Sequence, residues 1–430
     1  MYLRTLLDRN PLLLETALEL HQSGRIPPNT WVVDLDTIAH NARALAAEAD
    51  RLGLTTYVMT KQHGRNPHIT LTALANGLDK TVAVDMQCAL LLRRYGVPVG
   101  HMGHLNQVPR RLIADAVAMR PDVITVYSLE RARWIDEAAR DQGVTQDLLI
   151  RVHAEGDLFF DGQEGGFAEP DVPAVAREIA ALEHVRLVGT TAFPCVVYNV
   201  DPAVAPTLTP NAETVARCAA NLREIGLDVR QVNMPGNTSA LTMPLLAEHG
   251  ATHVEPGHGL LGTTPNHAFV DGLPEVPAYA YVSEISHHVG DRAYAFGGGL
   301  FRDIFRPGER SEALVGSSFA EARDNPVGYE ADIPQIIDYH AVLSEGARCR
   351  VGDTALFGFR TQMQMTRSYI APVSGLSRGE PHLHMLFDHA NTAMDERFEP
   401  IDPATVRADV DRLLAASGVD APPADASLRH

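Results

Sequence analysis

The chain has 430 residues, of which 45% are hydrophobic and 21% are charged, an ordinary composition for a globular protein. A formal net charge of -18 argues against binding to nucleic acids or acidic membrane surfaces, because both require a basic surface. The length exceeds that of one compact core and predicts two domains. No apolar run approaches the ~20 residues needed to cross a bilayer.

The cysteines and the first ten residues indicate the compartment. The four cysteines have no CxxC spacing, so they indicate neither a zinc site nor a disulfide framework. Residues 1–10 carry Arg4, Asp8 and Arg9 in place of the apolar core of a signal peptide. We therefore expect a cytoplasmic protein.

The chain begins with a leucine-rich stretch that ends at Pro27 and Pro28, and residues 1–27 are predicted to form a helical clasp. Short apolar strands then alternate with amphipathic helices. The predicted strands are 31–35, 56–59, 81–84, 97–102, 123–126, 148–152, 185–190, 229–233 and 252–255. The predicted helices are 38–52, 69–76, 88–95, 110–119, 129–141, 172–182 and 212–225.

This alternation is typical of βαβ units around a parallel sheet. About eight units fit a closed (β/α)8 barrel, for which ~250 residues is typical, and we place it at residues 28–275. A doubly wound open sheet is the alternative, but no GxGxxG follows the first strand. From about residue 278 alternating segments and glycine turns predict an antiparallel β domain at 276–414, and residues 415–430 are expected to be a loose tail.

Lys61 ends the apolar run of residues 56–59, and the breakers Gly64 and Pro67 follow it. The chain contains only two lysines, Lys61 and Lys80, and uses arginine for every other basic side chain. An amine can lose its proton and form a Schiff base with a carbonyl, whereas a guanidinium cannot. Position and scarcity together favour a Schiff-base lysine over a solvated lysine at a loop edge.

Two loops after late strands could hold an anion. The first contains Gly236, Asn237, Thr238 and Ser239, and the second runs from Glu255 through Gly257 and His258. Glycines at such turns let backbone N–H groups face an anion, and the hydroxyl groups add donors. Because barrels often bind phosphate at their late strands, the two loops predict a phosphate site.

Several short motifs, in order, are similar to one enzyme family. The run WVVDLDTIAHN at 31–41 resembles the opening strand and helix of the alanine racemase-like, fold-type III enzymes that use pyridoxal 5'-phosphate (PLP). The resemblance is closest to the YhfX-like branch and covers roughly residues 30–370. The other matching segments are MTKQHG at 59–64, NTS at 237–239 and VEPGHGLLG at 254–262.

The resemblance implies a PLP-dependent amino-acid racemase or epimerase that works through a Lys61 Schiff base and a quinonoid carbanion. Asn237, Thr238, Ser239, Glu255, Gly257 and His258 would bind the cofactor. The family's second acid/base is a tyrosine from the partner subunit, so a head-to-tail homodimer with shared active sites is expected. The segment around Gly328, Tyr329 and Asp332 is similar to its context and makes Tyr329 the candidate, with Tyr339 and His340 behind it.

Glu255 departs from the racemase pattern, which has arginine opposite the pyridine nitrogen. A carboxylate there favours the protonated pyridinium and strengthens the electron sink, as in the related decarboxylases. The alternatives are therefore a PLP-dependent lyase, either a D-amino-acid dehydratase or a decarboxylase, and a non-catalytic PLP-binding protein. An aldolase that acts on phosphosugars without PLP ranks below them. The sequence does not identify the substrate.

The remaining candidates are polar residues near predicted strand ends. Arg151 and Gln163 lie in a segment similar to one that positions substrate, although Arg151 could equally pair with Asp34 or Glu155. Single histidines are more often structural than catalytic. The histidines at these positions are His63, His101, His104, His153 and His258. His382 and His384 have metal-ligand spacing, but no cysteine lies nearby, and no metal is predicted.

Overall fold

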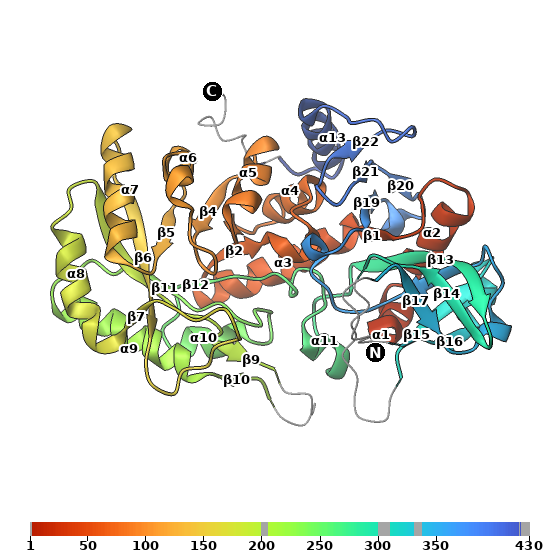
Figure 1. The fold of residues 1–430 in the computed structure, drawn as a ribbon, viewed down its shortest axis with the longest axis horizontal. Helices are drawn as coiled ribbons and strands as arrows, with labels where there is room; N and C mark the ends of the chain where they lie inside the picture. The colour runs from red at the N-terminus through yellow and green to blue at the C-terminus, as the bar shows by residue number, and fades with distance from the viewer. Residues whose placement is uncertain (1, 199–204, 300–309, 331–337, 421, 423–430) are drawn as a thin grey trace.

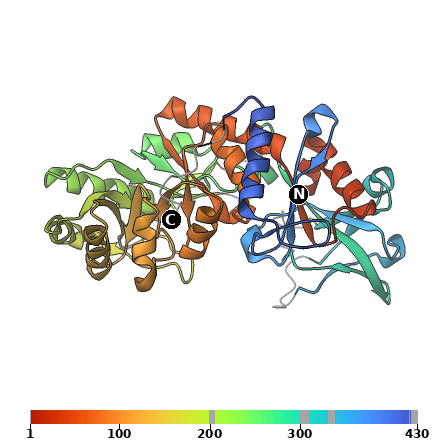
Figure 2. The same ribbon diagram turned by 90° about the horizontal axis from the view of Figure 1, so that it is seen from above.

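The computed structural model describes residues 2–198, 205–299, 310–330, 338–420 and 422. Two β-sheets lie side by side, one wrapped by helices at the left of Figure 1 and one at the right. Figure 2 shows the same two bodies from above. Within the described ranges, no helix combines the length and apolar character that a membrane crossing would require.

The first sheet is a closed barrel of eight parallel strands, as predicted, and the open-sheet alternative is wrong. Its strands follow one another around the barrel, and β2 and β12 pair to close it, with Thr55 opposite His253. The strands are β2 (Thr55–Met59), β3 (Lys80–Ala83), β4 (Val99–Met102), β5 (Val123–Val126), β6 (Gln146–His153), β8 (Val185–Thr191), β11 (Gln231–Asn233) and β12 (His253–Val254).

Helices cover the outside of the barrel, and some of them begin at polar caps. Asp34, Asn66 and Ser128 each accept backbone N–H bonds at a helix start, which fixes where the chain turns back along the barrel. The helices are α3 (Leu35–Leu52), α4 (Pro67–Ala75), α5 (Met86–Arg94), α6 (Ile113–Ala118), α7 (Leu129–Asp141), α8 (Val172–Ala180), α9 (Pro210–Glu224), α10 (Met243–Glu248) and α11 (Pro265–Phe269).

Two glycines make room inside the barrel wall. A Cβ on Gly189 in β8 would lie 1.7 Å from the carbonyl oxygen of Gln231 in the next strand. A Cβ on Gly100 in β4 would lie 2.3 Å from the Tyr57 ring. Both contacts are closer than atoms can approach, so glycine at these positions lets neighbouring strands and the Tyr57 ring pack.

Strand β1 (Thr30–Asp34) was predicted to open the barrel, and this is wrong. It belongs to the second sheet, where it pairs antiparallel with β13 (Tyr279–Val289) and parallel with β19 (Tyr369–Ser374). Trp31 and Val33 face one side of that sheet and Val32 the other, and all three are fully buried. A strand buried on both faces has the continuous apolar pattern of a barrel strand, so the sequence pattern did not distinguish the two sheets.

The second sheet is antiparallel apart from the β1–β19 pair, and it confirms the predicted C-terminal β domain. Its remaining strands are β14 (Arg292–Phe296), β15 (Glu312–Gly316), β16 (Pro326–Gly328), β17 (His340–Leu343), β18 (Thr354–Phe357), β20 (His382–Leu383), β21 (Leu386–Phe387) and β22 (Ala393–Met394). Helix α12 (Phe319–Arg323) packs on β15. Most of the predicted tail, 421 and 423–430, lies outside the described residues.

The N-terminal helices α1 (Tyr2–Arg9) and α2 (Pro11–Gln22) cover one face of the second sheet with their leucines. Helix α1 also reaches the barrel. The Tyr2 hydroxyl donates to the carbonyl oxygen of Thr264, 3.1 Å away, and Arg9 donates to that of Glu275. The N-terminal segment therefore contacts both bodies.

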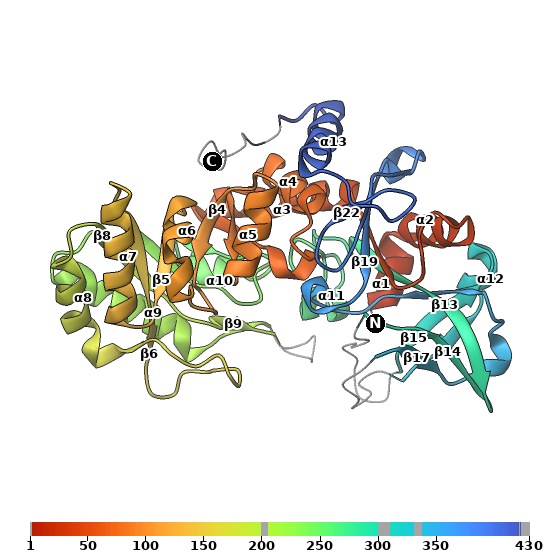
Figure 3. The same ribbon diagram turned by 45° about the horizontal axis from the view of Figure 1, so that its top comes forward.

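A second junction joins α13 (Pro403–Ala416) to α4, as Figure 3 shows. The Asp409 carboxylate accepts hydrogen bonds from His68 on α4, at 2.9 Å, and from His384, at 2.8 Å. These bonds hold the pKa of Asp409 well below its usual range. His384, considered as a metal ligand from the sequence, thus belongs to a His–Asp–His cluster in which His68 is buried and the other two residues are partly buried, while His382 is exposed.

Candidate active site

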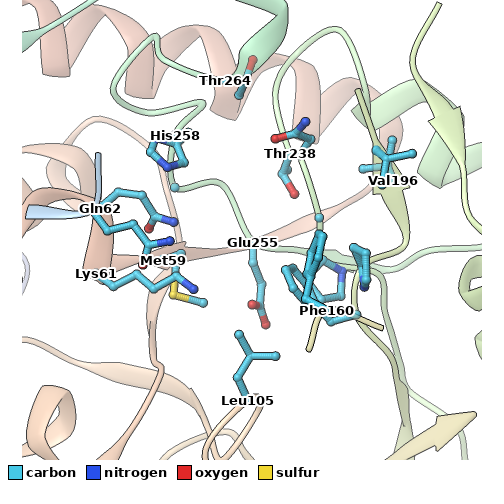
Figure 4. Close-up of a pocket in the computed structure, with 18 of the residues that line it drawn as sticks. Met59, Lys61, Gln62, Leu105, Phe160, Val196, Thr238, Glu255, His258 and Thr264 are labelled. Atoms are coloured by element: carbon cyan, nitrogen blue, oxygen red, sulfur yellow. The ribbon is translucent and has the colours of Figure 1, made fainter. Parts of the chain in front are cut away.

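A cavity of about 380 Å³ opens at the carboxyl ends of the barrel strands. Most of its wall comes from the loops after these strands, and Arg360 and Gln362 reach it from the segment that follows β18. Figure 4 shows the Lys61, Glu255, Thr238 and His258 side chains around this space. The other lining residues are Met59, Gln62, His104, Leu105, Phe160, Gln163, Phe193, Pro194, Val196, Val197, Tyr198, Pro235, Gly236, Asn237, Gly257 and Thr264.

Lys61 extends into the cavity from a 3-10 turn, η1 (Thr60–His63), directly after β2. The turn ends at Gly64, whose φ of 65° suits glycine, and a Cβ there would lie 2.5 Å from Ile370 of the second sheet. Burial lowers the pKa of Lys61, the Glu255 carboxylate opposes this shift, and the Arg360 guanidinium adds to it. Neutral amine is therefore more abundant on Lys61 than on a solvated lysine.

Glu255 lies at the end of β12 and is only 3% exposed. Its Oε1 atom accepts a hydrogen bond from His101 Nδ1 at 2.7 Å and another from the Asn233 amide at 2.9 Å. Burial acts to raise the pKa of Glu255, but these donors and the nearby His104 ring lower it to about 2. Within the described chain its Oε2 atom has no partner, so an ionised oxygen faces the cavity.

His104 is fully buried beside Glu255, with Nε2 at 4.0 Å from the free Oε2 atom. Neither ring nitrogen of His104 has a hydrogen-bond partner among the described residues. Burial lowers the pKa of His104 to about 3, so the ring is neutral near pH 7. The two groups leave an acceptor and an uncommitted imidazole on one wall of the cavity.

The two predicted anion loops also line the cavity and pack tightly through glycine. A Cβ on Gly257 would lie 2.5 Å from Gln62 Oε1, and one on Gly236 would lie 2.7 Å from the carbonyl oxygen of Val196. In the described structure Thr238 Oγ1 and His258 Nε2 are buried without partners. Burial, followed by the charge of Arg360, lowers the pKa of His258 well below its usual value.

Of the residues expected to bind the cofactor in these loops, Asn237, Thr238, Gly257 and His258 line the cavity, whereas Ser239 does not. Its backbone N–H donates to the Thr242 hydroxyl, which donates in turn to the carbonyl oxygen of Asn237. Ser239 thus shapes the loop from behind. The unpartnered hydroxyl and imidazole groups, with glycine at the closest approach, fit a phosphate, and Glu255 fits a protonated pyridine nitrogen. These groups match the donor and acceptor needs of PLP.

Arg151 is placed differently from its expected role as a substrate ligand. It is fully buried behind the cavity wall, where Nη1 donates to the Tyr127 hydroxyl and Nη2 to the carbonyl oxygens of Gln163 and Phe193. It pairs with neither Asp34 nor Glu155. Gln163 does line the cavity, and its side-chain Oε1 has no partner among the described residues. Arg151 therefore supports the loops that carry Gln163 and Phe193.

The other candidates lie around this centre or far from it. His63 is buried and bonds Thr70, and His101 bonds both Glu255 and Thr125. His153 lies at the end of β6 against the Phe159 ring. Tyr329 follows β16 in the second sheet, packs against Phe357 and does not line the cavity of its own chain. Tyr339 is exposed, and Asp332 lies outside the described residues.

Sequence reasoning did not single out Arg360, Gln362, Phe160 or Phe193. The first two follow a strand of the second sheet more than a hundred residues after the barrel, and no local motif marks them. The aromatic pair has ring centroids 5.7 Å apart and forms one side of the cavity. Phe160 and Phe193 lie on the barrel's own loops after β6 and β8, whereas only the packing of the two sheets against each other brings Arg360 and Gln362 to the strand ends.

Comparison with known proteins identifies both parts of the chain. Residues 33–265 match the family described as alanine racemase, N-terminal domain. Residues 280–383 match the family described as YhfX-like, C-terminal domain. The chain is 39% identical over 399 residues to the uncharacterized protein YhfX of Escherichia coli strain K12. The aligned region covers 92% of this chain and 100% of that protein.

Solved structures share the fold at low sequence identity. D-threonine aldolase from Filomicrobium marinum superposes with a TM-score of 0.61 at 16% identity, over 85% of this chain and 95% of that one. Alanine racemase from Corynebacterium glutamicum superposes with a TM-score of 0.55 at 17% identity, over 77% and 90%. One fold is thus shared with proteins that carry out different reactions, so the reaction must be argued from the side chains in the cavity.

Proposed function

The chain belongs to the alanine racemase-like family and, within it, to the YhfX-like branch, and from this premise we propose a PLP-dependent enzyme that acts at the Cα atom of an amino acid. One observation carries the proposal. A lysine with a lowered pKa and an ionised glutamate face the same cavity, which also offers unpartnered polar groups of Thr238 and His258 to an anion. Groups perturbed in this way, gathered in one cavity, are typical of a catalytic site.

Each side chain has a definite task. Lys61 would hold the cofactor aldehyde covalently, Asn237, Thr238, Gly257 and His258 would receive the phosphate, and the Glu255 carboxylate would accept a hydrogen bond from the protonated pyridine nitrogen. When bound, PLP supplies an electron sink for the charge left on Cα. With its Nζ atom free, Lys61 would take or return the Cα proton of the substrate on its own face.

We favour racemisation or epimerisation, which requires a second acid/base on the opposite face of the substrate. We assign that role to Tyr329 of the partner subunit in a head-to-tail homodimer. Tyr329 does not reach the cavity of its own chain, so the assignment requires the dimer. Sedimentation of the cofactor-loaded protein should therefore give a dimer, and a fully loaded monomer would contradict the shared site.

A lyase is the second candidate, and Glu255 is the observation in its favour. Its carboxylate keeps the pyridine nitrogen protonated, which strengthens the electron sink and suits elimination or decarboxylation as well as proton exchange. The residues that bind the cofactor would be the same. The two candidates differ only in what happens at Cα and on which face.

The test is to incubate the PLP-loaded enzyme with L- and D-amino acids in deuterated water. The proposal predicts that at least one amino acid gives its opposite enantiomer carrying deuterium at Cα. Tyr329→Phe should keep deuterium exchange on one face and lose inversion by roughly 10²-fold or more, the size of one acid/base contribution. Release of ammonia, carbon dioxide or an aldehyde without inversion would replace the racemase with the lyase.

Two further results would reject an enzyme of either kind. PLP uptake with neither Cα exchange of any amino acid nor release of carbon dioxide, ammonia or an aldehyde would indicate a cofactor-binding protein. Tight binding of a phosphosugar with no affinity for PLP would instead indicate an aldolase on the same barrel, in which Glu255 would have no evident task.

A further inference from the structure

Arg360 is the only arginine among the described residues that line the cavity. It lies in the segment between β18 and the 3-10 turn η5 (Met363–Met365), which passes from the second sheet over the strand ends of the barrel. Other arginines of the second sheet are paired, such as Arg310 with Glu345 and Arg367 with Asp338. Within the described ranges Arg360 has no such ion pair, and its buried Nε has no hydrogen-bond partner.

The backbone around Arg360 is fixed from both sides. The Tyr279 hydroxyl donates to the carbonyl oxygen of Phe359, at 2.9 Å, and accepts from the N–H of Thr361, at 3.3 Å. The Phe359 ring packs edge-on against Trp31, with centroids 5.2 Å apart. Arg360 is therefore presented to the cavity by a rigid support, and this lowers the entropy lost when it binds a ligand.

The charges around Arg360 require an anion. Its guanidinium lowers the pKa of both Lys61 and His258, so it lies within electrostatic reach of the lysine and of the phosphate loops. One oxygen of Glu255 is held by His101 and Asn233, and the proposed function assigns the other oxygen to the pyridine nitrogen. A partly buried cation without a counter-charge is costly, and a ligand that supplies a negative group removes that cost.

Two anions enter such a site, the cofactor phosphate and the substrate carboxylate. The phosphate is served by the two loops with their turn amides, Thr238 and His258. In the proposed function Lys61 is bonded to the cofactor, and His258 is neutral. The Arg151 guanidinium already donates hydrogen bonds to the Tyr127 hydroxyl and to the carbonyl oxygens of Gln163 and Phe193. On the described cavity wall this leaves Arg360 as the one cation for a carboxylate.

We propose that Arg360 binds the α-carboxylate of the substrate, so that the C-terminal β domain of the same chain selects amino acids over simple amines. This inference rests on the proposed function. The planar guanidinium matches a carboxylate through two parallel N–H···O bonds. The carboxylate end of the substrate would thus face the second sheet, with its amine toward Lys61.

The experiment uses the PLP-loaded enzyme with glycine and glycinamide, which differ only in the carboxylate, and follows their binding by the change in cofactor absorption. Wild type should bind glycine more tightly than glycinamide. Arg360→Gln should weaken glycine binding by about tenfold to a hundredfold, the value of charged hydrogen bonds, and leave glycinamide binding unchanged. Arg360→Lys should recover part of the affinity, since it keeps the charge without the fork.

Arg367→Gln is the matched control, because Arg367 lies in the same region but is paired with Asp338 at the surface, and its glycine affinity should equal that of wild type. PLP affinity, measured separately by titration of the cofactor, should stay within about twofold in Arg360→Gln, well below the tenfold step of one charged contact. Equal losses for glycine and glycinamide, or a tenfold loss of PLP affinity, would overturn the inference. Failure of wild type to take up PLP would overturn the proposed function as well.

Discussion

At the amino ends of the barrel strands, charged side chains form ion pairs with one another. Lys80 at the start of β3 pairs with Asp122, and Asp147 at the start of β6 pairs with Arg186 and Arg230. At the carboxyl ends the arrangement is the reverse, because Arg360 has no counter-charge and Glu255 keeps a free oxygen within the described chain. Charged side chains thus neutralise one another at the amino end of the barrel, whereas at the carboxyl end charged groups remain available to bind a ligand.

The two lysines make the comparison sharpest. Lys80 is tied to a carboxylate at a partly exposed rim, while Lys61 is surrounded by protein and has a lowered pKa. The same side chain is a structural cation in one place and, in our proposal, a reactive amine in the other. The two lysines differ because one lies at the amino end of a barrel strand and the other follows the carboxyl end of a strand. Single substitutions at each end test this comparison.

The largest effect is expected from Lys61→Arg, with Lys80→Arg as its matched control. An arginine cannot form the covalent bond to the cofactor or exchange a proton, so turnover should fall by about 10²- to 10⁴-fold or more. Lys80→Arg keeps the charge opposite Asp122 and should leave turnover near wild type. Comparable losses in both variants would remove the distinction between the two ends.

A smaller effect is expected from Glu255→Gln. The neutral amide does not stabilise the positive charge of a protonated pyridine as a carboxylate does, and we expect turnover to fall by roughly 10²- to 10³-fold, as for other preorganised electrostatic groups. Asp147→Asn at the opposite end breaks two ion pairs and should change turnover by less than about twofold. Steady-state kinetics on both variants checks this, and an unaffected Glu255→Gln would refute the assigned role.

Low pH should reduce the folding stability of the protein, because histidines are buried at the carboxyl end of the barrel. Burial lowers the pKa of His104 and of His63 to about 3, below the value of ~6.5 in an unfolded chain. Their neutral forms are therefore fully compatible with folding above pH 6.5, and stability falls as pH drops from 6.5 toward 3. Each buried histidine costs up to about 1.4 kcal/mol per pH unit in that window.

Denaturant unfolding of the cofactor-free protein between pH 4 and pH 8 measures this slope. His104→Asn should flatten it, while His249→Asn, at an exposed position, should reproduce the wild-type slope. An unchanged slope in His104→Asn would contradict this prediction, because it would show that protonation of His104 does not destabilise the fold.

The smallest effect is expected at the amino rim itself. Asp122→Asn removes the partner of Lys80 in a pair that is about one-third exposed on each side. Such pairs contribute ~1 kcal/mol or less to stability. The free energy of unfolding should therefore fall by no more than that, and the affinity for PLP should not change. A larger loss of PLP binding than of stability would mean that the amino end also serves the site.

The sequence anticipated those features that depend on local pattern. The strand that ends at Lys61, the scarcity of lysine, and the glycine loops at Gly236 and Gly257 were all visible as short motifs. The eight barrel strands followed from alternation and length. Glu255 was found because it replaces an expected arginine beside Pro256 and Gly257.

The features that the sequence missed depend on contacts between distant segments. Strand β1 was assigned to the barrel because burial on both faces gives the same apolar pattern in either sheet. Arg151 was matched to substrate by its motif, but the carbonyl oxygens of Gln163 and Phe193 claim its guanidinium. No local motif marks Arg360 in the sequence. It lines the cavity only because the second sheet packs against the barrel.

The central claim is that Lys61 alone carries the cofactor. We would mix the pure protein with PLP, reduce it with borohydride, digest it and locate the added mass by mass spectrometry. The account predicts one modified lysine, Lys61, with Lys80 unmodified and the Lys80→Arg variant labelled to the same extent. Label on Lys80, or no stable label in wild type, would contradict it.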